Sequence, residues 1–336
     1  MLKWVLILIL ITVSELLYFR IADRFNIIDR PNERSSHSSI VLRGGGLIFL
    51  LAVWLYAAFF GVALWPFLIG MTLIAGISFI DDVRPLSDGV RLVFHFTAIG
   101  LLFYQWGILQ WSHWWIILLG LILCVGIINA YNFMDGINGI TGGYSLAILL
   151  PLAWLNAKGG ALGSFTDQNL IYVTILADLV FCFFNFRPRG KAKCFAGDVG
   201  SVGIAFILVY MVGSLILRTG DFTYIILLAV YGVDSILTIV HRILLHENIG
   251  QAHRKHVYQI MANELKMSHV TVSCIYMGIQ LVIAAGLFLI PDTPLWHWSY
   301  FFAVIVILAS VYVLFKKKYY HLHEEYLASL SKHNEL

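Results

Sequence analysis

Long apolar runs constrain this chain more than any other feature of its sequence. A helix needs about 20 apolar residues to cross the roughly 30 Å hydrocarbon core of a bilayer. Eleven runs approach that length, at residues 4–22, 45–64, 66–80, 90–107, 114–130, 143–157, 169–186, 201–218, 222–240, 270–290 and 297–315. The third and the sixth are short, so we expect an all-α, polytopic membrane protein with ten or eleven spans.

The composition supports this fold class and excludes others. The 336 residues are 60% hydrophobic and 12% charged, which is too apolar for a soluble chain of this size. A net charge of +3 without a basic array argues against nucleic-acid binding. The four cysteines form no CxxC pair, so neither a disulfide framework nor a zinc site is indicated. We expect one transmembrane catalytic domain at residues 1–315 and a short cytoplasmic tail at 316–336.

The distribution of Lys and Arg predicts the orientation. Eleven spans place 19 of the 22 basic residues on one side and leave Lys3, Lys158 and Arg218 on the other. The positive-inside rule then puts the N-terminus outside and the C-terminus in the cytoplasm. All polar-rich loops fall on the cytoplasmic face, at residues 23–44, 81–91, 131–143, 186–200 and 241–269. A transporter is expected to carry ionisable groups at mid-membrane, so this pattern favours an enzyme that works at one face.

The first polar loop contains Arg34 and the sequence Arg43-Gly-Gly-Gly46. Arginines are suited to holding phosphate, and glycines at a helix start let backbone N–H groups approach an anion. The alternative is an ordinary positive-inside loop with a flexible helix entry.

The second segment places Asp81 and Asp82 at the end of an apolar run, with Arg91 ten residues after Asp81. Adjacent carboxylates at a membrane boundary are costly unless cations or a metal neutralise them. Mg²⁺ on a diphosphate is a natural partner, since Mg²⁺ prefers carboxylate, water and phosphate oxygens. The alternative is a pair of solvated helix-capping acids.

The third segment has polar residues at three-residue intervals, Asn129, Asn132, Asp135 and Asn138, followed by several glycines. The first three fall near one face at helical pitch. Asn132 is a candidate ligand for a metal or nucleobase, Asp135 a candidate metal or proton site, and Asn138 a nucleotide contact. A glycine-rich turn with capping Asn and Asp is the alternative.

The fourth segment runs from Asn185 through a cationic stretch that includes Lys193 to Gly197-Asp198. Asp198 opens the next apolar run, so it is either an N-cap or a metal ligand. The position of other aspartates on the same face favours the ligand.

The fifth segment is the longest inner loop and holds His253, Arg254 and His256. They form a compact cationic set suited to a diphosphate, and the alternative is a basic segment lying on anionic lipid. Asp234 lies two turns before the cytoplasmic end of the preceding run. An interhelical hydrogen bond is expected for it.

Together, in this order and spacing, the five segments resemble the polyprenyl-phosphate N-acetylhexosamine-1-phosphate transferase family over residues 20–260. The resemblance implies a plasma (inner) membrane enzyme that transfers a sugar 1-phosphate from a UDP-sugar to undecaprenyl phosphate, releases UMP, and uses Mg²⁺ or alternatively Mn²⁺. A homodimer is an open alternative to a monomer. The residues expected in each role are Asp81, Asp82, Asp135 and His253 for catalysis; Arg34, Arg43, Arg91, Asn138, Asn185, Lys193, Arg254 and His256 for substrate binding; and Asp198 and Asn132 for the metal.

Two stretches separate branches of that family. Ala252-His-Arg-Lys-His-Val-Tyr-Gln259 replaces the run of consecutive histidines of the phospho-MurNAc-pentapeptide translocases. With Arg30-Pro-Asn-Glu-Arg-Ser-Ser-His37, it resembles the branch that initiates O-antigen and capsule synthesis. The sugar stays open among GlcNAc, FucNAc and QuiNAc, because such choices rest on a few loop contacts.

Two other functions are alternatives to sugar-1-phosphate transfer. A CDP-alcohol phosphotransferase requires an Asp-Gly-x-x-Ala-Arg motif, and the chain has Asp135-Gly136 without the Ala-Arg. A transporter or flippase of a lipid-linked or anionic solute moves its substrate without releasing UMP.

Overall fold

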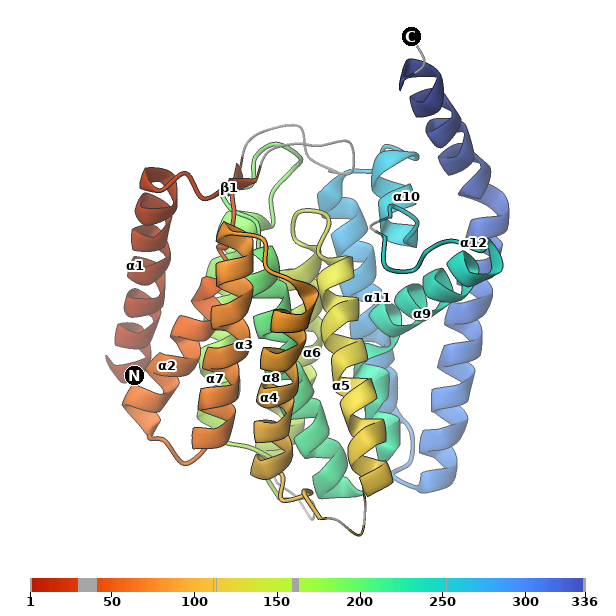
Figure 1. Ribbon diagram of the computed structural model, residues 1–336. Helices are drawn as coiled ribbons and strands as arrows, with labels where there is room; N and C mark the ends of the chain where they lie inside the picture. The colour runs from red at the N-terminus through yellow and green to blue at the C-terminus, as the bar shows by residue number, and fades with distance from the viewer. Residues whose placement is uncertain are drawn as a thin grey trace.

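The computed structural model describes residues 2–29, 41–110, 112, 114–158, 163–251 and 253–334, and these are almost entirely helical (Figure 1). The elements are α1 (Leu2–Arg24), β1 (Ile28–Asp29), β2 (Val41–Leu42), α2 (Leu47–Phe60), α3 (Trp65–Val83), α4 (Asp88–Gln105), α5 (Trp114–Met134), α6 (Ile140–Lys158), α7 (Gln168–Asn185), α8 (Gly197–Thr219), the 3-10 helix η2 (Phe222–Leu228), α9 (Ala229–Leu244), α10 (Val257–Asn263), α11 (His269–Leu289) and α12 (Pro294–Asn334). The two short strands pair in antiparallel fashion.

Each of the eleven apolar runs corresponds to a helix, with η2 and α9 sharing one run. Within the described ranges, nine helical segments are long and apolar enough to cross a membrane, which confirms a polytopic all-α fold. Two predicted spans do not meet that measure. The helix α2 has 14 residues, and α4 begins with the charged residues Asp88 and Arg91.

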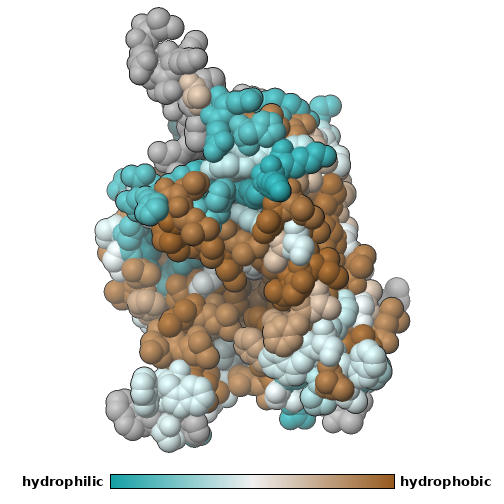
Figure 2. All heavy atoms as spheres, turned by 90° about the vertical axis from the view of Figure 1, so that its right-hand side faces the viewer, coloured by the Kyte–Doolittle hydropathy of each residue, from teal (hydrophilic) through white to brown (hydrophobic). Residues whose placement is uncertain are grey.

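The described residues of the five polar segments lie at the same end of the bundle, the upper end in Figure 1. They follow α1, α3, α5, α7 and α9, each of which runs towards this end. Figure 2 shows a broad band of apolar side chains below a group of hydrophilic ones at this end. The prediction that the polar loops share one face is therefore confirmed, and the side of the membrane that they face stays a prediction.

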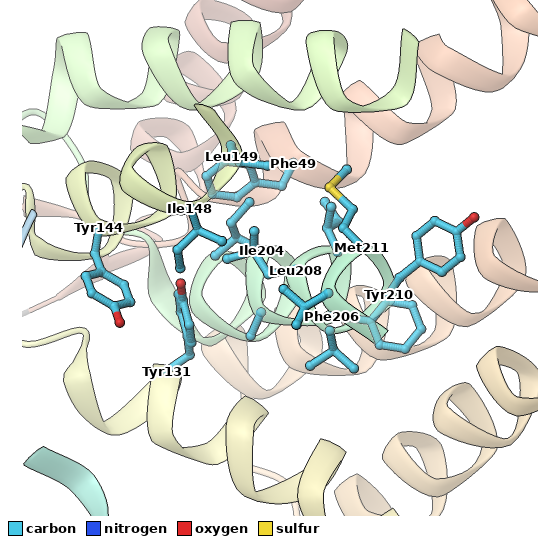
Figure 3. Packing of buried hydrophobic residues seen from close by; sticks show 14 of the residues in the cluster. Phe49, Tyr131, Tyr144, Ile148, Leu149, Ile204, Phe206, Leu208, Tyr210 and Met211 are labelled. Carbon is cyan, nitrogen blue, oxygen red and sulfur yellow. The ribbon is translucent and has the colours of Figure 1, made fainter. Parts of the chain in front are cut away.

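The helix α8 is the centre of the bundle. It packs against α2, α3, α5 and α6, and nearly all of its side chains are buried. Figure 3 shows Ile204, Phe206 and Leu208 of α8 surrounded by side chains from neighbouring helices. Burial on all sides explains why this helix is apolar throughout rather than amphipathic. Its first turn, which carries Asp198, is consequently held from several directions.

The last helix, α12, is 41 residues long, or about 60 Å at 1.5 Å per residue. That is about twice the hydrocarbon thickness, so its C-terminal half projects beyond the band of apolar side chains. The helix passes without a break through residue 315, where the sequence suggested that a separate tail would begin.

Candidate active site

Asp82 is a buried carboxylate at the polar end of the bundle. Its Oδ1 and Oδ2 atoms each accept a hydrogen bond at 3.0 Å, from the backbone N–H groups of Asp198 and Val199. The Nε atom of Arg43 lies 2.8 Å from Oδ1, and the Asp82 side chain is fully buried. Asp82 thus caps the N-terminus of α8 from the end of α3, where a negative charge is also favoured by the helix dipole.

Asp81 points to another partner. Its Oδ2 atom lies 2.7 Å from Nη1 of Arg91, and the same nitrogen lies 3.6 Å from Oδ2 of Asp198. Nη2 of Arg43 approaches Asp198 at 3.9 Å from the other direction. Asp198 therefore lies between two guanidinium groups, and its side chain is 22% exposed, compared with 11% for Asp81. It is the most accessible carboxylate of this aspartate cluster, which we define as Asp81, Asp82, Asp198, Arg43 and Arg91.

The donor chemistry of the cluster fits Mg²⁺. The oxygens of Asp81 and Asp198 are the hard ligands that this ion prefers. Within the described part of the chain, no group of three or more His, Cys, Asp or Glu residues is placed to hold a metal by itself. A site of one or two carboxylates that is completed by substrate phosphates is the usual arrangement for Mg²⁺.

Asn132 connects the end of α5 to the start of α8. Its Oδ1 atom accepts a hydrogen bond from Ser201 Oγ at 2.9 Å, and its side chain is hydrogen-bonded to Asp198. These contacts orient the Asp198 carboxylate. The direct metal role expected for Asn132 stays a prediction beside this positioning role.

Asp135 lies in the turn after α5. Burial raises its pKa to about 7, although it accepts a hydrogen bond from Thr141 Oγ1 at 2.6 Å. The following residue, Gly136, is covered by Tyr258 of α10, whose hydroxyl donates to the Phe133 carbonyl at 2.9 Å. The turn thereby joins the third polar segment to the fifth.

Asn138 and Asn185 use their amides within the protein. The Nδ2 atom of Asn138 donates to the carbonyls of Arg187 and Pro188, at 2.9 and 3.1 Å. Asn185 accepts from the Gly139 N–H at 2.8 Å and donates to the Cys194 carbonyl at 2.9 Å. Both side chains are almost inaccessible. Their geometry supports holding two loops together, in place of the substrate contacts expected from the sequence.

The glycines after Arg43 serve close packing. Gly45 and Gly46 donate their N–H groups to the carbonyls of Phe195 and Ala196, so these groups are already used inside the protein. A Cβ atom on Gly46 would lie 2.0 Å from the Cα of Gly200. The expected anion-binding role of these two N–H groups is thus replaced by a close approach of α2 to α8.

The predicted site includes two further basic residues. Arg34 lies outside the described residues. Lys193 is exposed on the segment before α8.

The fifth segment differs from its expected cationic character. Burial, together with the nearby His256, lowers the pKa of His253 to about 3, so this ring is neutral at pH 7. The Nη1 atom of Arg254 donates to the Tyr326 hydroxyl at 3.0 Å. His256 is buried, with Nδ1 3.4 Å from Oδ1 of Asp234. The fixed positive charge of this set is therefore on Arg254.

Asp234 and Tyr258 also hold α10 in place, a contribution that the sequence did not predict for either residue. Asp234 accepts hydrogen bonds from Tyr276 Oη at 2.6 Å and from the Val257 N–H at 3.1 Å, so it fixes the start of α10. The expected interhelical hydrogen bond is confirmed. In the sequence, Asp234 could be singled out because it is an isolated acid in an apolar run, whereas no sequence feature singled out Tyr258.

Comparison with known proteins finds similarity to polyprenyl-phosphate sugar-1-phosphate transferases. Residues 64–216 match the family model for glycosyl transferase family 4. A probable undecaprenyl-phosphate N-acetylglucosaminyl 1-phosphate transferase of Bacillus subtilis is 26% identical over 313 residues, covering 87% of this chain and 85% of that protein. A decaprenyl-phosphate N-acetylglucosaminephosphotransferase of Mycobacterium tuberculosis is 29% identical over 220 residues, covering 56% of this chain and 53% of the relative. The match thus spans about half of the mycobacterial protein.

A relative with a pentapeptide-transferase name also matches. A phospho-N-acetylmuramoyl-pentapeptide-transferase of Dictyoglomus thermophilum is 27% identical over 216 residues, covering 57% of this chain and 64% of that protein. The relatives of both branches have similar identities to the chain, 26–29%, so sequence identity does not distinguish the two branches.

Proposed function

Because residues 64–216 match the model of glycosyl transferase family 4 and a relative over most of the chain is an undecaprenyl-phosphate N-acetylglucosaminyl 1-phosphate transferase by name, we propose that the chain is such a polyprenyl-phosphate N-acetylhexosamine-1-phosphate transferase. It would transfer a sugar 1-phosphate from a UDP-N-acetylhexosamine to undecaprenyl phosphate and release UMP. The observation that carries the proposal is the aspartate cluster at the polar end of a membrane-spanning bundle. Carboxylates for a metal and two arginines for phosphate meet where a water-soluble nucleotide and a lipid phosphate can both arrive.

The reaction is phosphoryl transfer between two anions. An oxygen of the lipid phosphate forms a bond to the sugar-bearing phosphorus, and the bond from that phosphorus to the bridging oxygen breaks, so UMP leaves with that oxygen. The barrier consists mainly of charge repulsion and alignment, which the protein lowers by supplying fixed cations and position. Arg43 and Arg91 are suited to this task, because a guanidinium stays charged and binds phosphate through two nitrogens.

The three aspartates of the cluster have different proposed roles. Asp198 is the proposed metal ligand, since it is the most accessible of the three. Bound Mg²⁺ would supply charge neutralisation and orientation of the diphosphate. Asp81 orients Arg91, and Asp82 holds the first turn of α8 in place. A catalytic role for Asp82 is therefore proposed as indirect, through the position of Asp198.

The relatives and the sequence support a finer assignment. The Bacillus and Mycobacterium relatives carry N-acetylglucosamine in their names, and the chain lacks the consecutive histidines of the pentapeptide branch. We therefore propose an N-acetylhexosamine such as GlcNAc as the donor sugar. The product would initiate a lipid-linked cell-surface polysaccharide of the O-antigen or capsule kind. The excess of Lys and Arg on the loop face supports a site on the cytoplasmic side of the plasma membrane.

The proposal is tested with purified protein in detergent. The protein is incubated with undecaprenyl phosphate, Mg²⁺ and, in turn, UDP-GlcNAc, UDP-FucNAc, UDP-QuiNAc and UDP-MurNAc-pentapeptide, and UMP and the lipid product are measured. We expect UMP release with one of the N-acetylhexosamines and its loss with EDTA. Release of CMP from a CDP-alcohol, or solute movement in proteoliposomes with no UMP from any donor, would contradict the proposal.

A further inference from the structure

One face of α12 carries five side chains that contact α9, the histidine loop or the C-terminal end of α10. We define the histidine loop as residues 245–256. The five side chains are Tyr312, Lys316, Tyr320, His323 and Tyr326. Their spacing of four, four, three and three residues puts them in one row along the helix. This row, the α12 stripe, lies mostly on the half of the helix that extends past the apolar band.

Lys316 is the central contact of the stripe. Its Nζ atom donates a hydrogen bond to the Lys255 carbonyl and lies 5.0 Å from the centre of the Tyr320 ring. The residue is only 7% exposed. Burying an ammonium group is costly unless it is paired, so this side chain is held by a defined set of partners. It ties α12 to the backbone of the loop between Arg254 and His256.

The C-terminal part of the stripe holds both sides of α10. The guanidinium of Arg254 donates to the Tyr326 hydroxyl at 3.0 Å and stacks on that ring at 4.9 Å. His323 Nδ1 lies 3.0 Å from Oε1 of Glu264, and both side chains are buried. The stripe therefore contacts Arg254, three residues before α10 begins, and Glu264, the residue after α10 ends.

The opposite side of the loop is held by α9. The guanidinium of Arg242 donates to the carbonyls of Asn248, Ile249 and Gln251 at 2.5, 3.0 and 3.0 Å. Glu247 accepts hydrogen bonds from Arg242 and from the Lys255 ammonium group. The described loop residues form neither helix nor strand. Their conformation therefore depends on these side chains rather than on a backbone ladder.

We propose that the α12 stripe is a positioning element for substrate binding, which holds Arg254 and His256 where a nucleotide diphosphate is bound. This inference rests on the proposed function, because the loop has a substrate to bind only if the chain acts on a UDP-sugar. Lys316, His323 and Tyr326 touch the loop and α10, so they act through the loop. The residues after 315 are then part of the enzyme's working structure rather than a dispensable tail.

The test compares Lys316→Met with Lys317→Met. Methionine keeps the apolar stem of Lys316 and removes its hydrogen bond, while Lys317 is exposed on the next position of the same helix. We expect Lys316→Met to raise KM for the UDP-sugar about 10-fold and to change kcat less than about 3-fold, as for loss of one charged hydrogen bond used in binding. Lys317→Met should leave both constants unchanged, and Lys316→Arg should restore part of the affinity.

Amide hydrogen exchange in detergent provides a readout that is independent of activity. Exchange in residues 245–256 should accelerate in Lys316→Met, while exchange in α8 stays as in the unmodified protein. Where Lys316→Met does not fold, Tyr326→Phe removes only one hydroxyl and should give the same pattern with a smaller rise in KM. Unchanged loop exchange, or faster exchange with an unchanged KM, would overturn the positioning role. Absence of UMP release from the unmodified protein would instead contradict the proposed function, and loop exchange would still decide whether the stripe holds the loop.

Discussion

The aspartate cluster and the histidine loop place their side chains in different ways. Asp81 and Asp82 lie in the last turn of α3, and Asp198 lies in the first turn of α8. Their positions follow from the packing of helix ends, including backbone contacts such as Gly46 against Gly200. The described residues of the histidine loop form no helix or strand, and they are held by side chains of α9 and α12. Helix packing therefore positions the charged side chains of the aspartate cluster. The histidine loop depends on individual side-chain contacts, so single substitutions should be able to loosen it.

Asp198→Asn removes the proposed metal ligand and should have the largest effect on chemistry. We expect UMP release to fall about 10³-fold, because a group that neutralises charge in the transition state is lost. The thermal midpoint in detergent should change little, as the side chain is partly exposed. Asp88→Asn is the matched control, since Asp88 also lies near Arg91 but its side chain is 92% exposed. Near-normal turnover in Asp198→Asn would remove the metal assignment.

Gly46→Ala should disturb the helix packing that positions the aspartate cluster, without changing the charges of the cluster. The added Cβ atom would lie 2.0 Å from the Gly200 Cα, so the starts of α2 and α8 must separate. We expect a loss of about 1–3 kcal/mol of stability or more, with reduced activity, measured by thermal unfolding and UMP release. Gly76→Ala in α3 is the control, because its Cβ meets no atom within 4 Å. Equal behaviour of the two variants would contradict the close packing described for α2 and α8.

Arg242→Met should loosen the histidine loop from the side of α9. The substitution leaves Glu247 and three loop carbonyls without their buried donor, at a cost of about 1–3 kcal/mol. We expect KM for the UDP-sugar to rise about 10-fold, with faster hydrogen exchange in the loop and unchanged Mg²⁺ dependence. Arg84→Met, at an exposed arginine after α3, is the control. A variant with a normal KM would show that α9 is not needed to hold the loop.

Asp135→Asn should give the smallest change, and one that depends on pH. The folded pKa of about 7 lies above the usual 3.8, so the folded state binds the proton more tightly between these values. The associated stability is present below pH 3.8 and is lost as pH rises through 7. In EDTA, we therefore expect the midpoint of the variant, relative to the unmodified protein, to rise by a few degrees from pH 5 to pH 8. A constant difference would argue against a buried, protonated Asp135.

The comparison also separates what sequence reasoning predicted from what it did not. The helices and the shared face of the five polar segments were predicted, because apolar runs of membrane length must form helices and successive helices reverse direction. Asn138 and Asn185 show the limit of this reasoning. An amide suits a nucleotide and a backbone carbonyl equally well, and only the neighbouring chain decides which of them it meets.

The sequence by itself determined that this is a helical membrane protein with most of its ionisable residues gathered at one end. Hydrophobicity and charge are local properties of each segment, and they decide whether that segment enters the membrane. The tertiary structure alone decided which of two adjacent aspartates caps α8, that His253 is partly buried with a lowered pKa, and that α12 holds the histidine loop. These properties arise where side chains from distant helices meet. Burial, pairing and hydrogen bonding there depend on the packed neighbours, which no single segment specifies.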